Sequence, residues 1–241
     1  MIALRRPGAE LATRPLHFFW VVDCSYSMKG EKIGALNNAI QSVVPEMKAA
    51  ADDNPSAQLY VRTLKFSSGA SWITPNPVKI EDFFWKDLSV DGITDMGKAF
   101  DLLSGQLTIE QMGEKALPPV LVLLTDGYPT DDYKSYLSKM LKLPWGKKAV
   151  RIAIAIGNDC DETVLEEFTG NCELVLKANN SSDLVKMIKW ASTAASTVSA
   201  PASRPEQVDI STVGSSAPLV LNMNTLPDST DDDDMSASDV W

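Results

Sequence analysis

The chain has 241 residues, of which 44% are hydrophobic and 22% charged, so a packed core is expected in one large domain with room for a tail. Its 22 Lys and Arg against 32 Asp and Glu give a formal charge of -10, which argues against binding to nucleic acids or to anionic membranes. Three cysteines without a CxxC pair and a single histidine exclude a conventional structural zinc site and a disulfide framework. The longest early apolar run, Phe18 to Val22, is too short to span a bilayer, and we expect a cytoplasmic protein.

After a polar lead-in over residues 1–15, short β-rich apolar runs alternate with stretches of helical periodicity. Six strands are predicted, at 17–23, 58–66, 70–74, 119–125, 150–156 and 173–177. Five helices are predicted, at 31–51, 95–107, 131–143, 161–168 and 183–198. Pro45 is expected to kink or restart the first helix, and Ser181 and Ser182 are the predicted N-caps of the last. The alternation predicts a doubly wound α/β domain over residues 16–198, with a mostly parallel six-stranded sheet and helices on both faces.

The composition changes after Val198, where Ser, Thr, Pro, Ala and Asp dominate. Residues 199–241 cannot bury enough apolar surface to offset the entropy of ordering, so we expect this acidic tail to be disordered. Within it, Ala217 to Leu226 is apolar enough to dock on another surface, and Asp231 to Asp234 form an acidic run. The sequence leaves three roles open for the tail: an autoinhibitory segment, a docking peptide, or a phosphorylation substrate.

Side chains bearing oxygen lie where a parallel sheet would bring them to one edge. Asp23, Ser25 and Ser27 form a DxSxS pattern at the end of the first predicted strand. Thr94 lies in the loop that enters the 95–107 helix, and Asp126 follows the 119–125 strand. Because ligands of open parallel sheets bind at the carboxyl ends of the strands, we expect all five side chains to lie close together. Two carboxylates and three hydroxyls are hard oxygen donors, which favour Mg²⁺, with Mn²⁺ second, over zinc or copper.

The DxSxS pattern, the later Gly-x-Thr loop and the LLTDG segment together resemble the metal-ion-dependent adhesion site of von Willebrand factor A domains, over roughly residues 16–198. Two segments, GEKIGALN from Gly30 and LLTDGYPTDD ending at Asp132, are similar to the tellurium-resistance-associated, TerY-like branch of that family. The resemblance implies that the three hydroxyls coordinate the ion directly or exchange with water. It implies that the two carboxylates hold the ion largely through waters. Such an ion stays under-neutralised and attracts a further anionic oxygen, typically from an acidic side chain of a partner.

The function implied by the resemblance is a non-enzymatic, Mg²⁺-dependent protein–protein interaction module without catalytic residues. TerY-like proteins are associated with a protein kinase and a PP2C-type phosphatase in bacterial stress-response systems. We therefore expect an adaptor in stress-response or defence signalling that binds a partner's Asp or Glu through the metal. Two alternatives remain open: a metal-dependent phosphohydrolase that uses Asp23, and a structural subunit with a vestigial metal site. Against the phosphohydrolase, Ser25 stands where such enzymes generally need a second acid.

Three residues beside these motifs have plainer interpretations. Asp95 follows Thr94, where the family usually has a neutral residue, and we expect it to start the next helix and complement the helix dipole. His17 is predicted to be structural because no nucleophile motif accompanies it. Cys24 is predicted to be a small buried residue on the core side of the turn.

Overall fold

Seven strands form one mostly parallel sheet in the computed structural model, which describes residues 13–199 except 55 and 159, and no side chains over 193–199. The strands are β1 (Arg14–Asp23), β2 (Ala57–Ser67), β3 (Gly69–Trp72), β4 (Val78–Lys79), β5 (Val120–Thr125), β6 (Val150–Ile156) and β7 (Val175–Ala178). Their order across the sheet is β3-β2-β1-β5-β6-β7, with β4 paired to β2. Only β3 and β4 run antiparallel to their neighbour β2. The acidic tail from residue 200 onward and the lead-in up to residue 12 lie outside the described residues.

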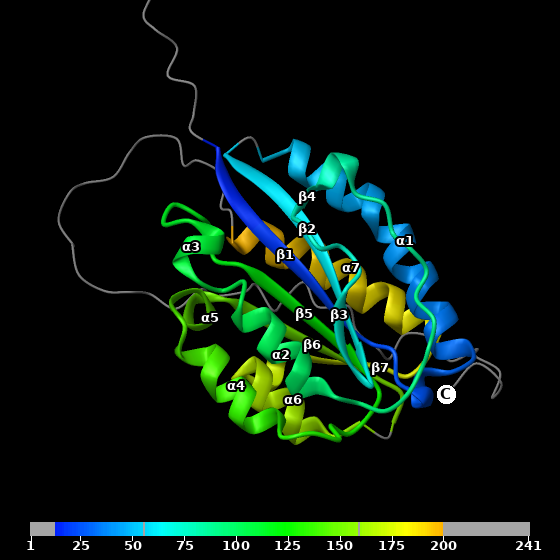
Figure 1. Ribbon diagram of the computed structural model, residues 1–241. Coiled ribbons are helices and arrows are strands. Elements are labelled where there is room, and N and C mark those ends of the chain that lie inside the picture. The colour runs from blue at the N-terminus through cyan, green and yellow to red at the C-terminus, as the bar shows by residue number, and fades with distance from the viewer. Residues whose placement is uncertain (1–12, 55, 159, 200–241) are drawn as a thin grey trace, which may run out of the picture.

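Helices cover both faces of the sheet, as the sequence predicted (Figure 1). They are α1 (Glu31–Asp52), α2 (Met96–Ser104), α3 (Ile109–Met112), α4 (Tyr133–Lys142), α5 (Pro144–Lys148), α6 (Glu162–Thr169) and α7 (Ser181–Ser199). Three short 3-10 turns, η1 (Tyr26–Met28), η2 (Ile80–Asp82) and η3 (Cys172–Leu174), lie between them. The pair α1 and α7 packs on one face, and α2, α4 and α6 pack on the other (Figure 1). Among the described residues, no helix is both long and apolar enough to cross a bilayer.

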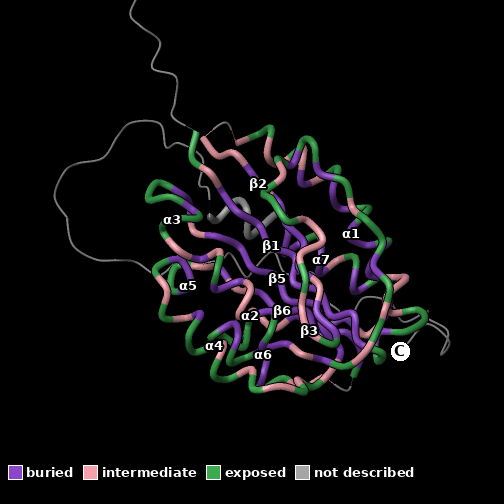
Figure 2. The backbone as a smooth tube through the Cα atoms, in the orientation of Figure 1, coloured by how far each residue is buried: buried purple, intermediate pink, exposed green. Residues whose placement is uncertain are grey.

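The central strand β1 separates two hydrophobic cores. Because side chains alternate along a strand, Phe18, Trp20 and Val22 enter the core beneath α1 and α7. Phe19 and Val21 point the other way, into the core beneath α2, α4 and α6. Burial on both faces explains why β1, β5 and β6 lack a polar face in the sequence, and Figure 2 shows this buried layer through the centre of the molecule.

The structure departs from the sequence prediction in local details. The two-residue strand β4 was not predicted, because a run so short carries no periodic signal and is defined only by its pairing with β2. Helix α1 continues through Pro45 and does not restart there, and the proline occupies an exposed position of the helix. The last helix is capped by Asn180 instead of Ser181 or Ser182, because the Asn180 side chain accepts a hydrogen bond from the Asp183 backbone N–H at 2.9 Å.

Replacing Phe168 with alanine tests the packing of the second core. Its ring stacks on Phe100 with centroids 5.5 Å apart, and both side chains are fully buried. Phe168→Ala should lower the free energy of unfolding in urea by about 3 to 5 kcal/mol. The matched control is Phe84→Ala, because Phe84 is 77% exposed and its loss should change the stability by less than about 1 kcal/mol. Equal losses in the two variants would contradict this description of the core.

Candidate metal centre

The predicted ligands come from three loops at the carboxyl edge of the parallel strands. Asp23 is the last residue of β1, and Asp126 follows β5, the strand beside β1. In the register of these two strands, Val22 lies next to Leu124, so Asp23 and Asp126 lie at the same edge of the sheet. Thr94 arrives from the loop before α2, where its backbone N–H donates to the Thr130 hydroxyl at 3.1 Å.

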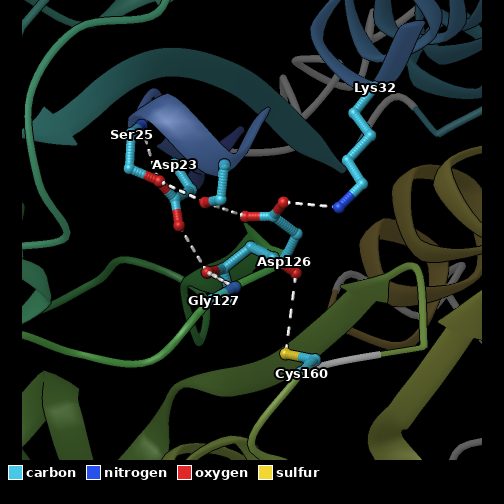
Figure 3. Close-up of polar contacts among 8 residues, drawn as sticks. Asp23, Ser25, Lys32, Asp126, Gly127 and Cys160 are labelled. Carbon is cyan, nitrogen blue, oxygen red and sulfur yellow. Dashed lines mark hydrogen bonds and ion pairs between the residues drawn. The ribbon is translucent and has the colours of Figure 1, made fainter. Parts of the chain in front are cut away.

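A chain of hydrogen bonds joins four of the five predicted ligands, and the neighbouring Thr125 extends it (Figure 3). The four ligands are Asp23, Ser25, Ser27 and Asp126. The Ser25 and Ser27 hydroxyl oxygens lie 2.9 Å apart, and the Ser27 hydroxyl donates to Oδ1 of Asp126 at 2.7 Å. Asp23 accepts from the Ser25 backbone N–H at 2.8 Å and from the Thr125 hydroxyl at 2.6 Å. The side chains are therefore held in position by one another before any ligand binds.

Gly127 shows that the fifth residue, Thr94, belongs to the same cluster. A Cβ built on Gly127 would lie 3.5 Å from Ser27 Oγ, 3.6 Å from Thr94 Oγ1 and 4.0 Å from Asp23 Oδ2. Three of the predicted oxygen donors thus surround one small space, which the absence of a side chain at Gly127 leaves open. The structure brings together all five residues that the sequence singled out.

The donor set fits a hard divalent cation. Two carboxylates and three hydroxyls gathered in one cluster are all-oxygen donors of the kind that Mg²⁺ and Mn²⁺ prefer. In the part of the chain that the structure describes, no three His, Cys, Asp or Glu side chains gather as metal ligands. A metal centre at this edge therefore depends on the hydroxyls as well as on the two acids.

Both carboxylates are buried, which makes their negative charge costly in the absence of a cation. Asp23 and Asp126 are buried residues at the same edge. Burial raises the pKa of Asp23, and the nearby charge of Asp126 adds to the rise, whereas the hydrogen bonds from Ser25 and Thr125 oppose it. A bound divalent cation would oppose this rise and favour the ionised form of Asp23.

Two residues that touch this cluster were not among the predicted ligands. Lys32, in the first turn of α1, places its Nζ 2.7 Å from Oδ2 of Asp126. Thr125 holds Asp23 through its hydroxyl and also accepts from the Gly127 backbone N–H at 3.2 Å. Both residues lie inside the segments that carry the family resemblance. The sequence did not predict their contacts, because neither residue belongs to a motif with a characteristic spacing.

Asp95 turns away from the cluster, as expected. It stands at the N-cap position of α2, and its carboxylate accepts hydrogen bonds from the Gly69 backbone N–H at 2.7 Å and the Thr130 hydroxyl at 3.1 Å. Through these two hydrogen bonds, the Asp95 carboxylate connects the start of β3 to the loop after β5. This leaves Asp23 and Asp126 as the two acids of the cluster.

His17 and Cys24 have the structural roles that were predicted. His17 is buried and stacks between the rings of Phe19 and Tyr60, and burial, with the charge of Arg62, lowers its pKa to about 4. Cys24 is fully buried in the core beneath α1, where burial raises the pKa of its thiol to about 12. The Cys24 thiol is therefore not a thiolate near neutral pH, and the His17 imidazole is only a weak base.

Exposed apolar side chains flank the residues of the cluster in the sequence. Tyr26 is 63% exposed between the two serines, Ile93 is 52% exposed before Thr94, and Tyr128 is 59% exposed after Gly127. We refer to these three residues as the apolar rim. They are half of the large hydrophobic side chains that are exposed in the described residues.

Comparisons with known proteins agree with this fold. A family model described as the von Willebrand factor type A domain matches residues 19–190. Among solved structures, a von Willebrand factor type A protein from Catenulispora acidiphila is 14% identical, with a TM-score of 0.55 over 76% of this chain and 43% of that chain. No curated protein sequence matches the chain.

Two further solved structures are similar. Proximal thread matrix protein 1 from the mussel byssus, with a zinc-occupied MIDAS motif, is 19% identical, with a TM-score of 0.56 over 78% of this chain and 49% of that one. The open conformation of the pilus adhesin SpaC from Lactobacillus rhamnosus GG is 14% identical, with a TM-score of 0.59 over 75% and 30% of the two chains. This chain spans less than half the length of these structures, and identities this low establish the fold alone.

Filling the space at Gly127 separates metal binding from folding. Gly127→Ala should fold normally, because the contacts of the added methyl group are at ordinary van der Waals distances and Gly127 is not among the glycines with positive φ. Its affinity for Mg²⁺, measured by isothermal titration calorimetry, should fall about ten-fold or more. Gly34→Ala is the control, because a Cβ at Gly34 meets nothing within 4 Å. Unchanged affinity in Gly127→Ala would place the cation elsewhere.

Removing the charge of Asp23 should have opposite effects with and without metal. The raised pKa of Asp23 contributes stability that is present below its unfolded value, near 3.8, and is lost as the pH rises through the folded value. In EDTA the melting temperature of Asp23→Asn should therefore rise relative to that of the wild type as the pH is raised towards neutral, because only the wild type then buries a charge. In Mg²⁺ the variant should lose the metal-induced rise in melting temperature. A difference in melting temperature between the variant and the wild type that does not change with pH in EDTA would contradict the assignment of buried charge.

Proposed function

The chain belongs to the von Willebrand factor type A domain family, and on that premise we propose that it is a non-enzymatic, Mg²⁺-dependent protein–protein interaction module. Domains of this family are commonly involved in protein interaction and metal-dependent binding. The observation that carries the proposal is the cluster itself: oxygens of Asp23, Ser27 and Thr94 lie around one small open space at Gly127, and Asp126 is joined to them through Ser27. A hard cation site whose residues are flanked in the sequence by exposed apolar side chains suits recognition of another protein.

The proposed ligands are the five residues of the cluster. Ser25, Ser27 and Thr94 would hold Mg²⁺, or Mn²⁺, through neutral hydroxyls, and Asp23 and Asp126 would hold it mainly through waters. When bound, the ion supplies a positive charge that neutral ligands do not cancel. Thr125 and the Ser25 backbone fix the orientation of Asp23, so the chain keeps the donors in place at little entropic cost.

The partner that this arrangement favours presents an Asp or Glu side chain to the metal. Apolar side chains flanking that acid would pack on Tyr26, Ile93 and Tyr128 and exclude water from the contact. On the resemblance of GEKIGALN and LLTDGYPTDD to the TerY-like branch, we propose that the chain is a cytoplasmic adaptor in bacterial stress-response or defence signalling, including tellurium resistance. A protein kinase and a PP2C-type phosphatase are the proposed partners.

A phosphohydrolase that uses Asp23 is less well supported. Both carboxylate oxygens of Asp23 already accept hydrogen bonds, one from the Ser25 backbone and one from the Thr125 hydroxyl. The residue two positions along is Ser25, which is not the second acid that aspartyl-phosphate chemistry generally uses. With both oxygens engaged, Asp23 is better placed to help hold a cation than to attack a phosphate.

Affinity capture with and without Mg²⁺ tests the proposed function. The immobilised full chain should retain a partner in Mg²⁺ and release it in EDTA, and the Ser25→Ala, Ser27→Ala double variant should lose at least about nine-tenths of the captured protein. Ser138→Ala, an exposed serine on α4, is the control and should capture normally.

Two outcomes would replace this function with the alternatives. Capture that persists in EDTA and in the double variant would favour a structural subunit whose metal site is vestigial. Turnover of p-nitrophenyl phosphate that is abolished by Asp23→Asn would favour the phosphohydrolase. Capture that is lost with the hydroxyls, without any such turnover, supports the interaction module.

A further inference from the structure

Lys32 is joined to the candidate metal centre through Asp126, and we propose that it sets the charge of that centre. It would weaken the binding of a divalent cation and strengthen the binding of a carboxylate to the loaded site. This inference rests on the proposed function, because it concerns the same cluster. It adds a residue that makes the site selective for an anionic partner.

The two oxygens of Asp126 face different partners. Oδ1 accepts a hydrogen bond from the Ser27 hydroxyl at 2.7 Å, and Ser27 is one of the residues around the space at Gly127. Oδ2 accepts from the Lys32 ammonium at 2.7 Å, and Figure 3 shows Lys32 reaching Asp126 from the side opposite Asp23 and Ser25. The lysine and a cation held by the hydroxyls would therefore use different oxygens of one carboxylate, and both can be present together.

Burial makes this ion pair stronger than the pairs on the surface. The Asp126 side chain is fully buried and that of Lys32 is 22% exposed. By contrast, pairs such as Lys134–Glu167 and Lys177–Glu162 lie between side chains that are much more exposed to water. Because solvent screens a buried charge poorly, the Lys32 ammonium acts on the whole cluster and not only on its nearest oxygen.

Because of the charges in the cluster, Lys32 should weaken the binding of the cation and strengthen the binding of the carboxylate. Asp23, Asp126 and Lys32 together carry one net negative charge, and a divalent cation changes this to one net positive charge. Without the lysine, the loaded site would be neutral. Lys32 therefore repels the incoming cation, but it leaves the loaded site with the positive charge that attracts an acidic side chain.

Lys29 provides a matched control for this effect. It has the same charge, lies three residues away and is exposed, with its ammonium 5.7 Å from the centre of the Tyr26 ring. Replacing either lysine with methionine changes the net charge of the protein equally. Only Lys32→Met removes a charge that contacts a buried carboxylate.

Mn²⁺ binding is the first measurement. Electron paramagnetic resonance of free Mn²⁺ gives its dissociation constant for the wild-type chain and for the Lys32→Met, Lys32→Arg and Lys29→Met variants. Lys32→Met should bind Mn²⁺ about five-fold more tightly, whereas Lys32→Arg and Lys29→Met should match the wild type within about two-fold. Lys32→Arg keeps the test meaningful if loss of the ammonium reduces stability, since it retains the charge.

Acetate binding to the Mn²⁺-loaded chain is the second measurement. Acetate that reaches the bound ion displaces water, which lowers the water-proton relaxation enhancement caused by Mn²⁺. Lys32→Met should need about five-fold more acetate than the wild type for the same decrease, and Lys29→Met should need the same amount. Tighter Mn²⁺ binding with weaker acetate binding in Lys32→Met supports the proposal.

Other results would overturn it. Unchanged or weaker Mn²⁺ binding in Lys32→Met would make Lys32 a structural partner of Asp126 only. Acetate binding that is equal in Lys32→Met and the wild type would remove its role in selecting a carboxylate. These results are distinct from failure of the proposed function, in which the wild-type chain itself would bind no Mn²⁺.

Discussion

Two buried carboxylates at one edge of the sheet are the constraint on which the site depends. Asp23 and Asp126 end neighbouring parallel strands, and the fold buries both of them. Such charges are tolerated only where hydrogen bonds and a positive charge compensate them. Ser27, Thr125 and Lys32 supply part of that compensation. The rest of the compensation would come from the cation that we propose for this site, so the metal-free chain should be less stable than the loaded one.

The fold explains why these residues meet. Strand β1 is covered on both faces, and its apolar run from Phe18 to Val22 ends at Asp23, which leads into the first loop. The apolar run of β5 likewise ends at Thr125, and Asp126 follows it. The loops at this edge also expose Tyr26, Ile93 and Tyr128, so one edge of the sheet combines hard oxygen donors with apolar surface. That combination suits recognition of a protein better than recognition of a free ion.

The sequence predicted the architecture because alternating apolar runs and helical periodicity extend over whole elements. Five separated ligands could be grouped because the ends of parallel strands share an edge, a rule that needs no side-chain contacts. Features of one or two residues could not be predicted in this way. The strand β4 exists only through its pairing with β2, and the Asn180 cap competes with two adjacent serines of similar propensity. Lys32 is one of several lysines in the chain, and only the tertiary structure shows that it reaches Asp126.

Anomalous diffraction from crystals grown with Mn²⁺ would locate the cation. We expect a single anomalous peak in the space beside Gly127, within reach of Ser27 and Thr94, with the Lys32 ammonium still bound to Oδ2 of Asp126. Solvent alone between the three loops at millimolar Mn²⁺, or a peak bound at another part of the surface, would contradict this expectation.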